Sequence, residues 1–135
     1  PEDKLRAYIR VYLRHILDEG RASWIHGLMT HELTDATPAL DMVFEQVFAP
    51  RVKYVSAIVA ELMGVPVTDE RVLRSVISIQ GQCNIYAHKA IRDRLVPRGP
   101  FTPAMIEKIA NHITDFSLGG IQASRLNSRP RASRR

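Results

Sequence analysis

The stretch SVISIQGQCNIYAHKAIRDRL, residues 75–95, decides the fold class of this chain. Its apolar residues recur with the 3.6-residue period of an α-helix, which we expect to begin at Thr68 or Asp69 and to run to about Leu95. On a wheel of ~100° per residue, its charged and small polar residues fill one arc of roughly 100°, and the other residues cover more than about 200°. A surface helix of a monomer needs an apolar arc of only ~100°, so this helix is expected to be buried on two sides.

The last apolar stretch, residues 103–122, has the same excess of apolar surface. Two consecutive helices that each need cover on two sides indicate two partners: the chain's own core and a second copy of the chain, in a dimeric four-helix bundle. The residues predicted for this dimer interface are Ile77, Gly81, His88, Ile106, Ile109, Ile113, Phe116 and Gly120. Glycines at 81, 119 and 120 would allow close backbone approach, although Gly119 and Gly120 would equally suit the end of the helix.

The rest of the body is also helical in pattern. Further helices are predicted over residues 5–17, 22–33 and 38–63. The residues expected to begin or end helices are Gly20, Thr37, Pro38, Gly64, Thr102 and Pro103. Pro50 interrupts the segment 38–63, which is either one kinked helix or two helices meeting near Ala49. The predicted fold class is therefore all-α, an orthogonal domain of five or six helices whose last two long helices form the dimeric bundle.

The charge of the chain is concentrated at one end. Of the formal net charge of +5, all five positive charges are accounted for by the five arginines of residues 123–135, a stretch without acids, so residues 1–122 are neutral. We expect a helical domain over residues 1–122 and a disordered basic tail over 123–135. The single cysteine gives no disulfide framework, and no apolar run reaches the ~18 residues of a membrane span. With no signal peptide, a cytoplasmic protein without membrane contact is expected. Because the chain begins with Pro1, something upstream has been removed or left out.

Motifs for catalysis or metal binding are missing from the pattern. No two of the five histidines have the i, i+4 spacing of a helical metal site, and no cysteine joins them. Nucleophile-elbow, phosphate-loop and dinucleotide motifs are also absent. We therefore predict no catalytic residue, no metal ligand and no cofactor, and we do not expect an enzyme.

Two features leave a choice between packing and ligand binding. Nearly all aromatic residues fall in the first four helical segments, where they either fill the core or line a cavity. The ridge of Gln80, Asn84 and His88, spaced four residues apart, needs hydrogen-bond partners. Those partners would come from a symmetry-related copy, which we slightly favour because polar groups fix helix register, or from a ligand.

Residues 31–64 and 75–95 resemble the C-terminal regulatory domain of TetR-type transcriptional repressors. The motifs that carry the resemblance are Glu32-Leu33, Thr37-Pro38-Ala39, Pro50 and Gly81-Gln82-Cys83. The resemblance covers about residues 5–122. It implies an N-terminal helix-turn-helix domain that binds operator DNA, a C-terminal pocket for a small effector, and a homodimer built from the last two long helices. No helix-turn-helix precedes the first helix here, so operator DNA would be bound only through an N-terminal domain that is missing from this chain.

The resemblance favours a ligand pocket over plain core packing. We expect it on the side of the fourth segment that faces the first three, since the dimer should use the other side. The predicted ligand-binding residues are Tyr12, His15, Trp24, Leu28, Phe44, Phe48, Ile79, Gln80, Cys83 and Asn84. Because the body has no net charge, the expected effector is uncharged or weakly charged and largely apolar. The alternatives are a stand-alone helical dimerisation module and a small helical enzyme.

Overall fold

The computed structural model describes residues 1–17, 31, 34–35, 37–95 and 101–126. Within these residues the regular structure is helical and no strand occurs, so the all-α prediction is confirmed. The elements are α1 (Glu2–Leu17), α3 (Pro38–Val43), the π-helix η1 (Phe44–Phe48), α4 (Ala49–Met63), α5 (Glu70–Asn84), the 3₁₀ turn η2 (Ile85–Ala87), α6 (Lys89–Leu95) and α7 (Pro103–Leu126). The predicted helix over 22–33 and its neighbour Gly20 fall almost entirely outside the described residues.

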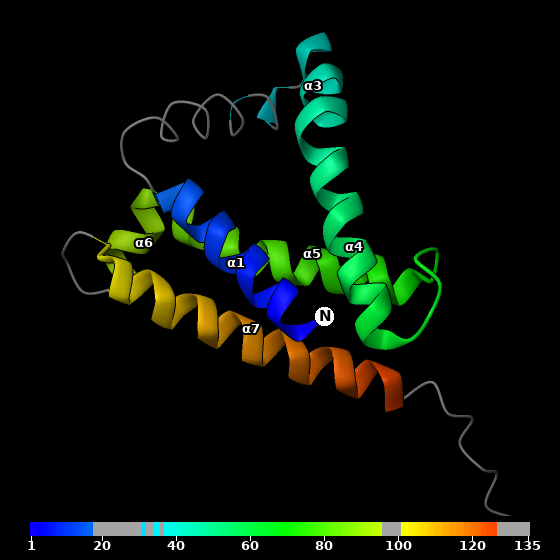
Figure 1. Cartoon of the computed structure of the whole chain (residues 1–135). Coiled ribbons are helices and arrows are strands. Elements are labelled where there is room, and N and C mark those ends of the chain that lie inside the picture. Colours follow the sequence, from blue (N-terminus) through cyan, green and yellow to red (C-terminus); the bar gives the residue numbers. More distant parts are fainter. Residues whose placement is uncertain (18–30, 32–33, 36, 96–100, 127–135) are drawn as a thin grey trace, which may run out of the picture.

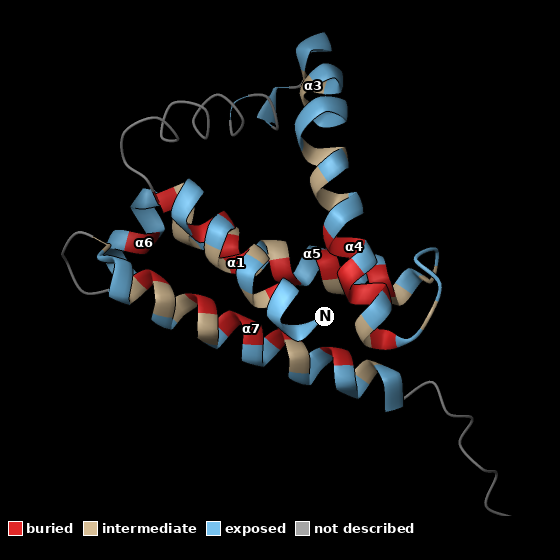
Figure 2. Ribbon diagram, in the orientation of Figure 1, coloured by how far each residue is buried: buried red, intermediate tan, exposed pale blue. Residues whose placement is uncertain are grey.

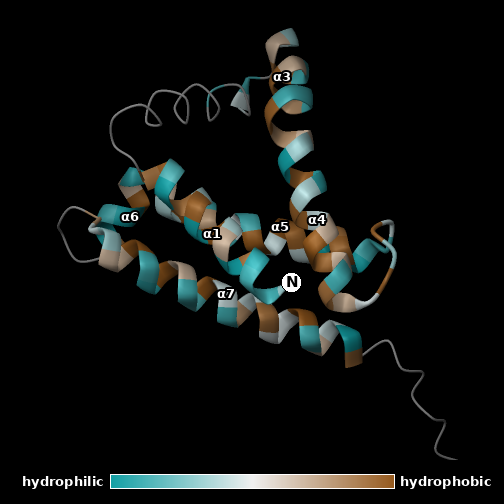
Figure 3. Cartoon of the chain, viewed as in Figure 1, coloured by the Kyte–Doolittle hydropathy of each residue, from teal (hydrophilic) through white to brown (hydrophobic). Residues whose placement is uncertain are grey.

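Three long helices and one crossing helix form the body. Helices α1, α5 and α7 pack against one another, and Figure 1 shows α1 lying alongside α7. The C-terminal half of α4 crosses them and contacts all three, while α3 and η1 continue the line of α4 away from the body (Figure 1). Hydrophobic segments of α4 and α5 meet where the two helices cross, as Figure 3 shows. Helices α1, α4 and α5 also contact one another, and the region where the three meet is called the corner.

The core is built from one face of each long helix. Figure 2 shows the buried residues of α1, α4, α5 and α7 turned towards one another. The largest fully buried side chains are Leu5, Ile9, Leu13, Val55, Val59, Val72, Val76, Ile79, Cys83, Ile113 and Thr114. The Thr114 hydroxyl is satisfied because it donates to the Ala110 carbonyl at 2.7 Å. The apolar stripes predicted from periodicity are therefore used mainly inside the single chain.

The segment 38–63 is continuous but changes its helix type before Pro50. Thr37 caps α3 by accepting a hydrogen bond from the Ala39 amide at 3.3 Å, with Pro38 in the first turn, as predicted. Pro50 has no amide hydrogen, and its ring would clash with the turn before it. The chain widens there into the π-helix η1, in which the Ala49 amide bonds to the Phe44 carbonyl. Of the two alternatives, the structure has one continuous helical segment, which changes from α-helix to π-helix before Pro50.

The segment that follows differs from the prediction. Asp69 caps α5, accepting from the Arg71 amide at 3.0 Å, and Gly64 ends α4 with a left-handed φ of 68°, both as expected. The single helix predicted to run to about Leu95 is wrong, because α5 ends at Asn84. The turn η2 and His88, with ψ of 88°, redirect the chain into the short helix α6. The turn η2 contacts α1. Helical periodicity in the sequence does not report such tertiary contacts, so it could not predict the break after α5.

Helix α7 is longer than its predicted counterpart. Thr102 accepts from the Met105 amide at 3.2 Å and Pro103 is the first helical residue, so the predicted start is confirmed. The helix continues through Gly119 and Gly120 to Leu126. These glycines therefore do not end the helix, and residues 123–126 of the predicted tail are helical. Residues 127–135 of the tail lie outside the part that the structure describes.

Candidate functional site

Polar side chains from α1 and α5 meet in the corner beside α4. The Tyr12 hydroxyl donates to Asn84 Oδ1 at 2.6 Å, and Gln80 Nε2 donates to the Tyr8 hydroxyl. Tyr8 and Tyr12 are four residues apart and therefore share one face of α1. Gln80 and Asn84 share one face of α5 for the same reason. The two tyrosine rings are stacked, with centroids 6.0 Å apart and an angle of 4° between their planes. The corner is therefore an ordered aromatic and amide cluster.

The electrostatics of the corner depend on burial and on Arg51 from α4. Burial raises the pKa of Tyr8 to about 12 and also raises the pKa of Tyr12, although Arg51 opposes both changes. Both phenols are therefore protonated at neutral pH and can donate a hydrogen bond. The guanidinium carbon of Arg51 lies 4.9 Å from the centroid of the Tyr12 ring, in cation–π contact.

Two hollows open beside this cluster. One, of about 250 Å³, is lined by Tyr8, Val11, Tyr12, His15 and Arg51. The other, of about 330 Å³, lies between α4 and α5 and is lined by Phe48, Arg51, Val52, Leu73, Val76, Ile77, Gln80, Gly81 and Asn84. Pockets for small ligands start at about 300 Å³ and combine apolar walls with a few polar groups. Arg51 is the residue that lines both hollows.

The corner contains half of the predicted ligand-binding residues. Tyr12, His15, Phe48, Gln80 and Asn84 all line one of the two hollows. The side-chain amides of Gln80 and Asn84 each have a tyrosine of the same chain as a hydrogen-bond partner, so neither depends on a second copy for that bond.

The other five predicted ligand-binding residues do not line these hollows or lie outside the described residues. Ile79 and Cys83 are core residues, and burial raises the pKa of the Cys83 thiol to about 12. Phe44 is 55% exposed on η1, where its ring stacks on Phe48 with centroids 6.2 Å apart, outside both hollows. None of these three residues lines either of the two hollows. Trp24 and Leu28 lie outside the described residues.

Eight residues that line the two hollows were not predicted to bind a ligand, and Tyr8 and Arg51 are the two polar residues among them. Tyr8 is four residues before Tyr12, so the spacing that selected Tyr12 would also have found Tyr8. Arg51 is three residues after Phe48 and shares its side of the helix. A charged residue on a helix usually faces solvent, and the three-dimensional arrangement brings Arg51 into the corner.

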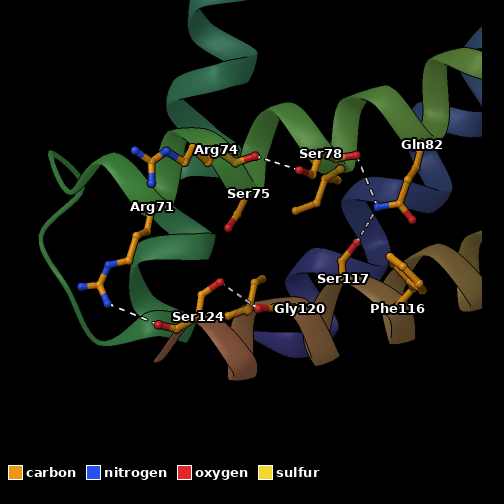
Figure 4. Close-up of a pocket in the computed structure, with 11 residues that line it drawn as sticks. Arg71, Arg74, Ser75, Ser78, Gln82, Phe116, Ser117, Gly120 and Ser124 are labelled. Carbon is orange, nitrogen blue, oxygen red and sulfur yellow. Dashed lines mark hydrogen bonds between the residues drawn. The ribbon is translucent and has the colours of Figure 1, made fainter. Parts of the chain in front are cut away.

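A second candidate surface is the groove between α5 and α7. It has a volume of about 300 Å³, and Figure 4 shows its lining side chains. The lining residues are Arg71, Arg74, Ser75, Ser78, Ile79, Gln82, Phe116, Ser117, Gly120, Ile121 and Ser124. Gln82 Nε2 donates across the groove to Ser117 Oγ at 3.4 Å, and Arg71 donates to the Ser124 carbonyl at 3.4 Å. Phe116 is one of these lining residues and is 67% exposed to solvent.

The residues predicted for the dimer interface point in several directions. Phe116 and Gly120 line the α5–α7 groove, whereas Ile77 and Gly81 lie on the other flank of α5 and line the hollow next to α4.

Three of the remaining four lie on α7. Ile106 and Ile113 are only 8% and 2% exposed, so their assignment to the interface is corrected: they are core residues. Ile109 is half-buried against the core, and exposed His88 lies in the link between η2 and α6. The apolar arcs of α5 and α7 therefore contribute to three places: the core, the hollow next to α4 and the groove between α5 and α7.

Metal and membrane features were searched within the described residues. There, no group of three histidine, cysteine or acidic side chains is placed to hold a metal ion. Nor does that part of the chain contain a helix long and apolar enough to cross a membrane.

Comparison with known families identifies the chain as a regulator domain. The family model of the C-terminal domain of the HTH-type transcriptional dual regulator CecR matches residues 1–121. Among curated proteins, none matches the chain.

Proposed function

The chain belongs to the family of the CecR C-terminal domain, a regulator domain, and on this premise we propose that it is the regulatory domain of a TetR-type transcriptional repressor. In this proposal it binds a small, largely apolar effector and forms a homodimer. The match over residues 1–121 is the observation that carries the proposal, and membership in a family of regulator domains favours a non-enzymatic role. Operator DNA would be bound by an N-terminal helix-turn-helix domain, since residues 1–122 have no net charge.

The proposed dimer surface is the α5–α7 groove. Phe116 exposes most of its ring there, and an exposed aromatic ring at the edge of a groove is a typical interface anchor. Gly119 and Gly120 lie inside α7, where each glycine costs roughly 1 kcal/mol relative to alanine. A Cβ atom at either position would meet nothing within 4 Å, so packing within the chain does not require these glycines. Close approach of a helix from a second copy would explain them.

The proposed effector site is the corner between α1, α4 and α5. Helix α5 contributes to both surfaces: Gln80 and Asn84 face the corner, while Ser78 and Gln82 line the groove. A ligand that changes the position of α5 would therefore change how two copies fit together. Coupling of two sites through one shared element is the requirement for allosteric control.

Sedimentation equilibrium tests the dimer, and thermal unfolding tests the effector. The expected mass is twice that of the 15.3 kDa chain, about 31 kDa. Some members of a library of small apolar compounds should raise the melting temperature by mass action on the folded state. Phe48→Ala should reduce those shifts more than the control Lys53→Ala, at an exposed position outside both hollows.

The outcomes separate the candidate functions. A dimer whose melting temperature responds to no compound would favour a stand-alone dimerisation module. A monomer without any ligand response would refute the proposed function, and turnover of any compound would favour an enzyme.

A further inference from the structure

Arg51 differs from the other shielded arginines of the chain. Among the described residues, five arginines are buried or half-buried: Arg6, Arg10, Arg51, Arg71 and Arg92. Four of them pair with a carboxylate, namely those of Asp115, Glu107, Asp69 and Asp93 in that order. No ion pair of the described residues includes Arg51. Its guanidinium instead lies over the Tyr12 ring and makes a side-chain hydrogen bond with Tyr12, a partner without charge at neutral pH.

The surroundings of Arg51 favour a negative partner. None of the described residues that line the two hollows is acidic. A partly desolvated charge without a counter-ion is costly, and an anion that pairs with it recovers part of that cost. The planar guanidinium presents paired N–H donors that match the two oxygens of a carboxylate. Arg51 therefore provides a recognition element for a carboxylate rather than for a neutral group.

Two neighbouring groups can add hydrogen bonds to the same anion. The Tyr8 hydroxyl accepts from Gln80 and still carries its own proton, because burial raises the pKa of Tyr8 to about 12. His15 lines the same hollow, and its ring has an N–H donor in either neutral tautomer. Hydrogen bonds from Tyr8 and His15 would hold a carboxylate on the α1 side of Arg51.

The second hollow, between α4 and α5, is mainly apolar. Besides Arg51, Gly81 and the two amides Gln80 and Asn84, its wall is formed by Phe48, Val52, Leu73, Val76 and Ile77. Leu73 and Ile77 remain 53% and 61% exposed although they face this hollow, so a ligand would remove their apolar surface from water. Because Arg51 lines both hollows, a molecule held there by its charged end would place an apolar body against this wall.

We propose that the effector is an organic carboxylate whose charged end pairs with Arg51 and whose apolar body occupies the hollow between α4 and α5. This inference rests on the proposed effector-binding function, and it replaces the uncharged or weakly charged effector expected from the sequence with an amphiphilic anion. Arg74 is a suitable control residue for the carboxylate pairing of Arg51. It is exposed, lies on the other flank of α5 and already forms an ion pair with Glu70.

Matched acids and amides test the proposal. The probes are benzoic, 2-naphthoic and decanoic acid, each with its primary amide, and binding is measured by titration calorimetry with the full chain at neutral pH. At least one acid should bind tenfold or more tighter than its amide, as expected when a charge-assisted pair replaces a neutral contact. Arg51→Gln should abolish this preference, because it should weaken binding of the acid at least tenfold more than binding of the amide. Arg51→Lys should keep part of the preference, and the control Arg74→Gln should keep all of it.

The outcomes separate this inference from the proposed function. If the amides or other neutral compounds bind as tightly as the acids, or if Arg51→Gln keeps the preference, the anionic effector is refuted while effector binding stands. If no compound of any charge binds or raises the melting temperature, the effector-binding function itself fails. Circular dichroism establishes that each variant is folded, and Arg51→Lys provides the test if Arg51→Gln does not fold.

Discussion

Truncation of Phe116 should separate self-association from folding. In a single chain this ring is 67% exposed, so Phe116→Ala should change the free energy of unfolding by no more than about 0.5 kcal/mol, as for other surface positions. In the proposed dimer the ring is covered. A phenylalanine exposes about 200 Å² in total, so about 130 Å² per copy, or about 260 Å² per dimer, would leave water.

The area gives a magnitude for the loss. At ~25 cal/mol per Å², complete burial of both rings would contribute about 6 kcal/mol. Alanine keeps the Cβ contact, and a ring at the edge of a groove stays partly wet, so we expect about half of this, ~3 kcal/mol. This corresponds to an increase of roughly 100-fold in the dimer dissociation constant.

Sedimentation equilibrium over a range of concentrations measures this constant. The matched control is Val67→Ala, because Val67 is an apolar residue that is 54% exposed in the turn before α5 and outside the groove. The control should dissociate like the unmodified chain. Equal dissociation constants for Phe116→Ala and the unmodified chain would refute the α5–α7 groove as the dimer surface.

Three further predictions concern stability. Ile113→Ala should lower the free energy of unfolding by about 2–5 kcal/mol in urea titrations, because Ile113 is 2% exposed in the core; a loss below 1 kcal/mol would contradict that placement. The pKa of Tyr8 is raised from 10.0 to about 12, so its contribution to stability is fully present below pH 10 and is lost as the pH rises towards 12. Urea midpoints measured across that range should fall more for the unmodified chain than for Tyr8→Phe. The pKa of Asp69 is lowered from 3.8 to about 2, chiefly by its hydrogen bond with the Arg71 side chain, so its contribution is present above pH 3.8 and is lost as the pH falls towards 2. Asp69→Ala should therefore show a smaller loss of stability than the unmodified chain over this acid range.

Local backbone chemistry explains which parts of the fold were predictable. Thr37 and Thr102 cap helices and Gly64 ends one, because these effects depend on a few neighbouring residues. The end of α5 at Asn84 was not predictable from the apolar pattern. A 3₁₀ turn of three residues keeps apolar side chains in nearly helical positions, so the period continues past the break.

The candidate site was only partly predictable, because residues of the core and residues of a pocket follow the same apolar spacing along a helix. Tyr12 and Asn84 were both predicted for the pocket, and they are in contact in the structure, because polar groups within an apolar face need partners. Cys83 and Ile113 satisfy the same periodicity but are fully enclosed by the chain itself. A helical wheel gives the width of an apolar face without identifying what covers it. Arg51 is a charged residue and so falls outside any apolar pattern. It lines the candidate site because α4 packs beside α1 and α5.

A crystal structure of the purified chain, grown with a compound that raises its melting temperature, tests the central claim most directly. The account predicts two copies related by a twofold axis through the α5–α7 groove, with Phe116 covered, and electron density for the compound in the corner beside Arg51. Copies that leave the groove open to solvent, with the compound bound away from α1, α4 and α5, would contradict the account.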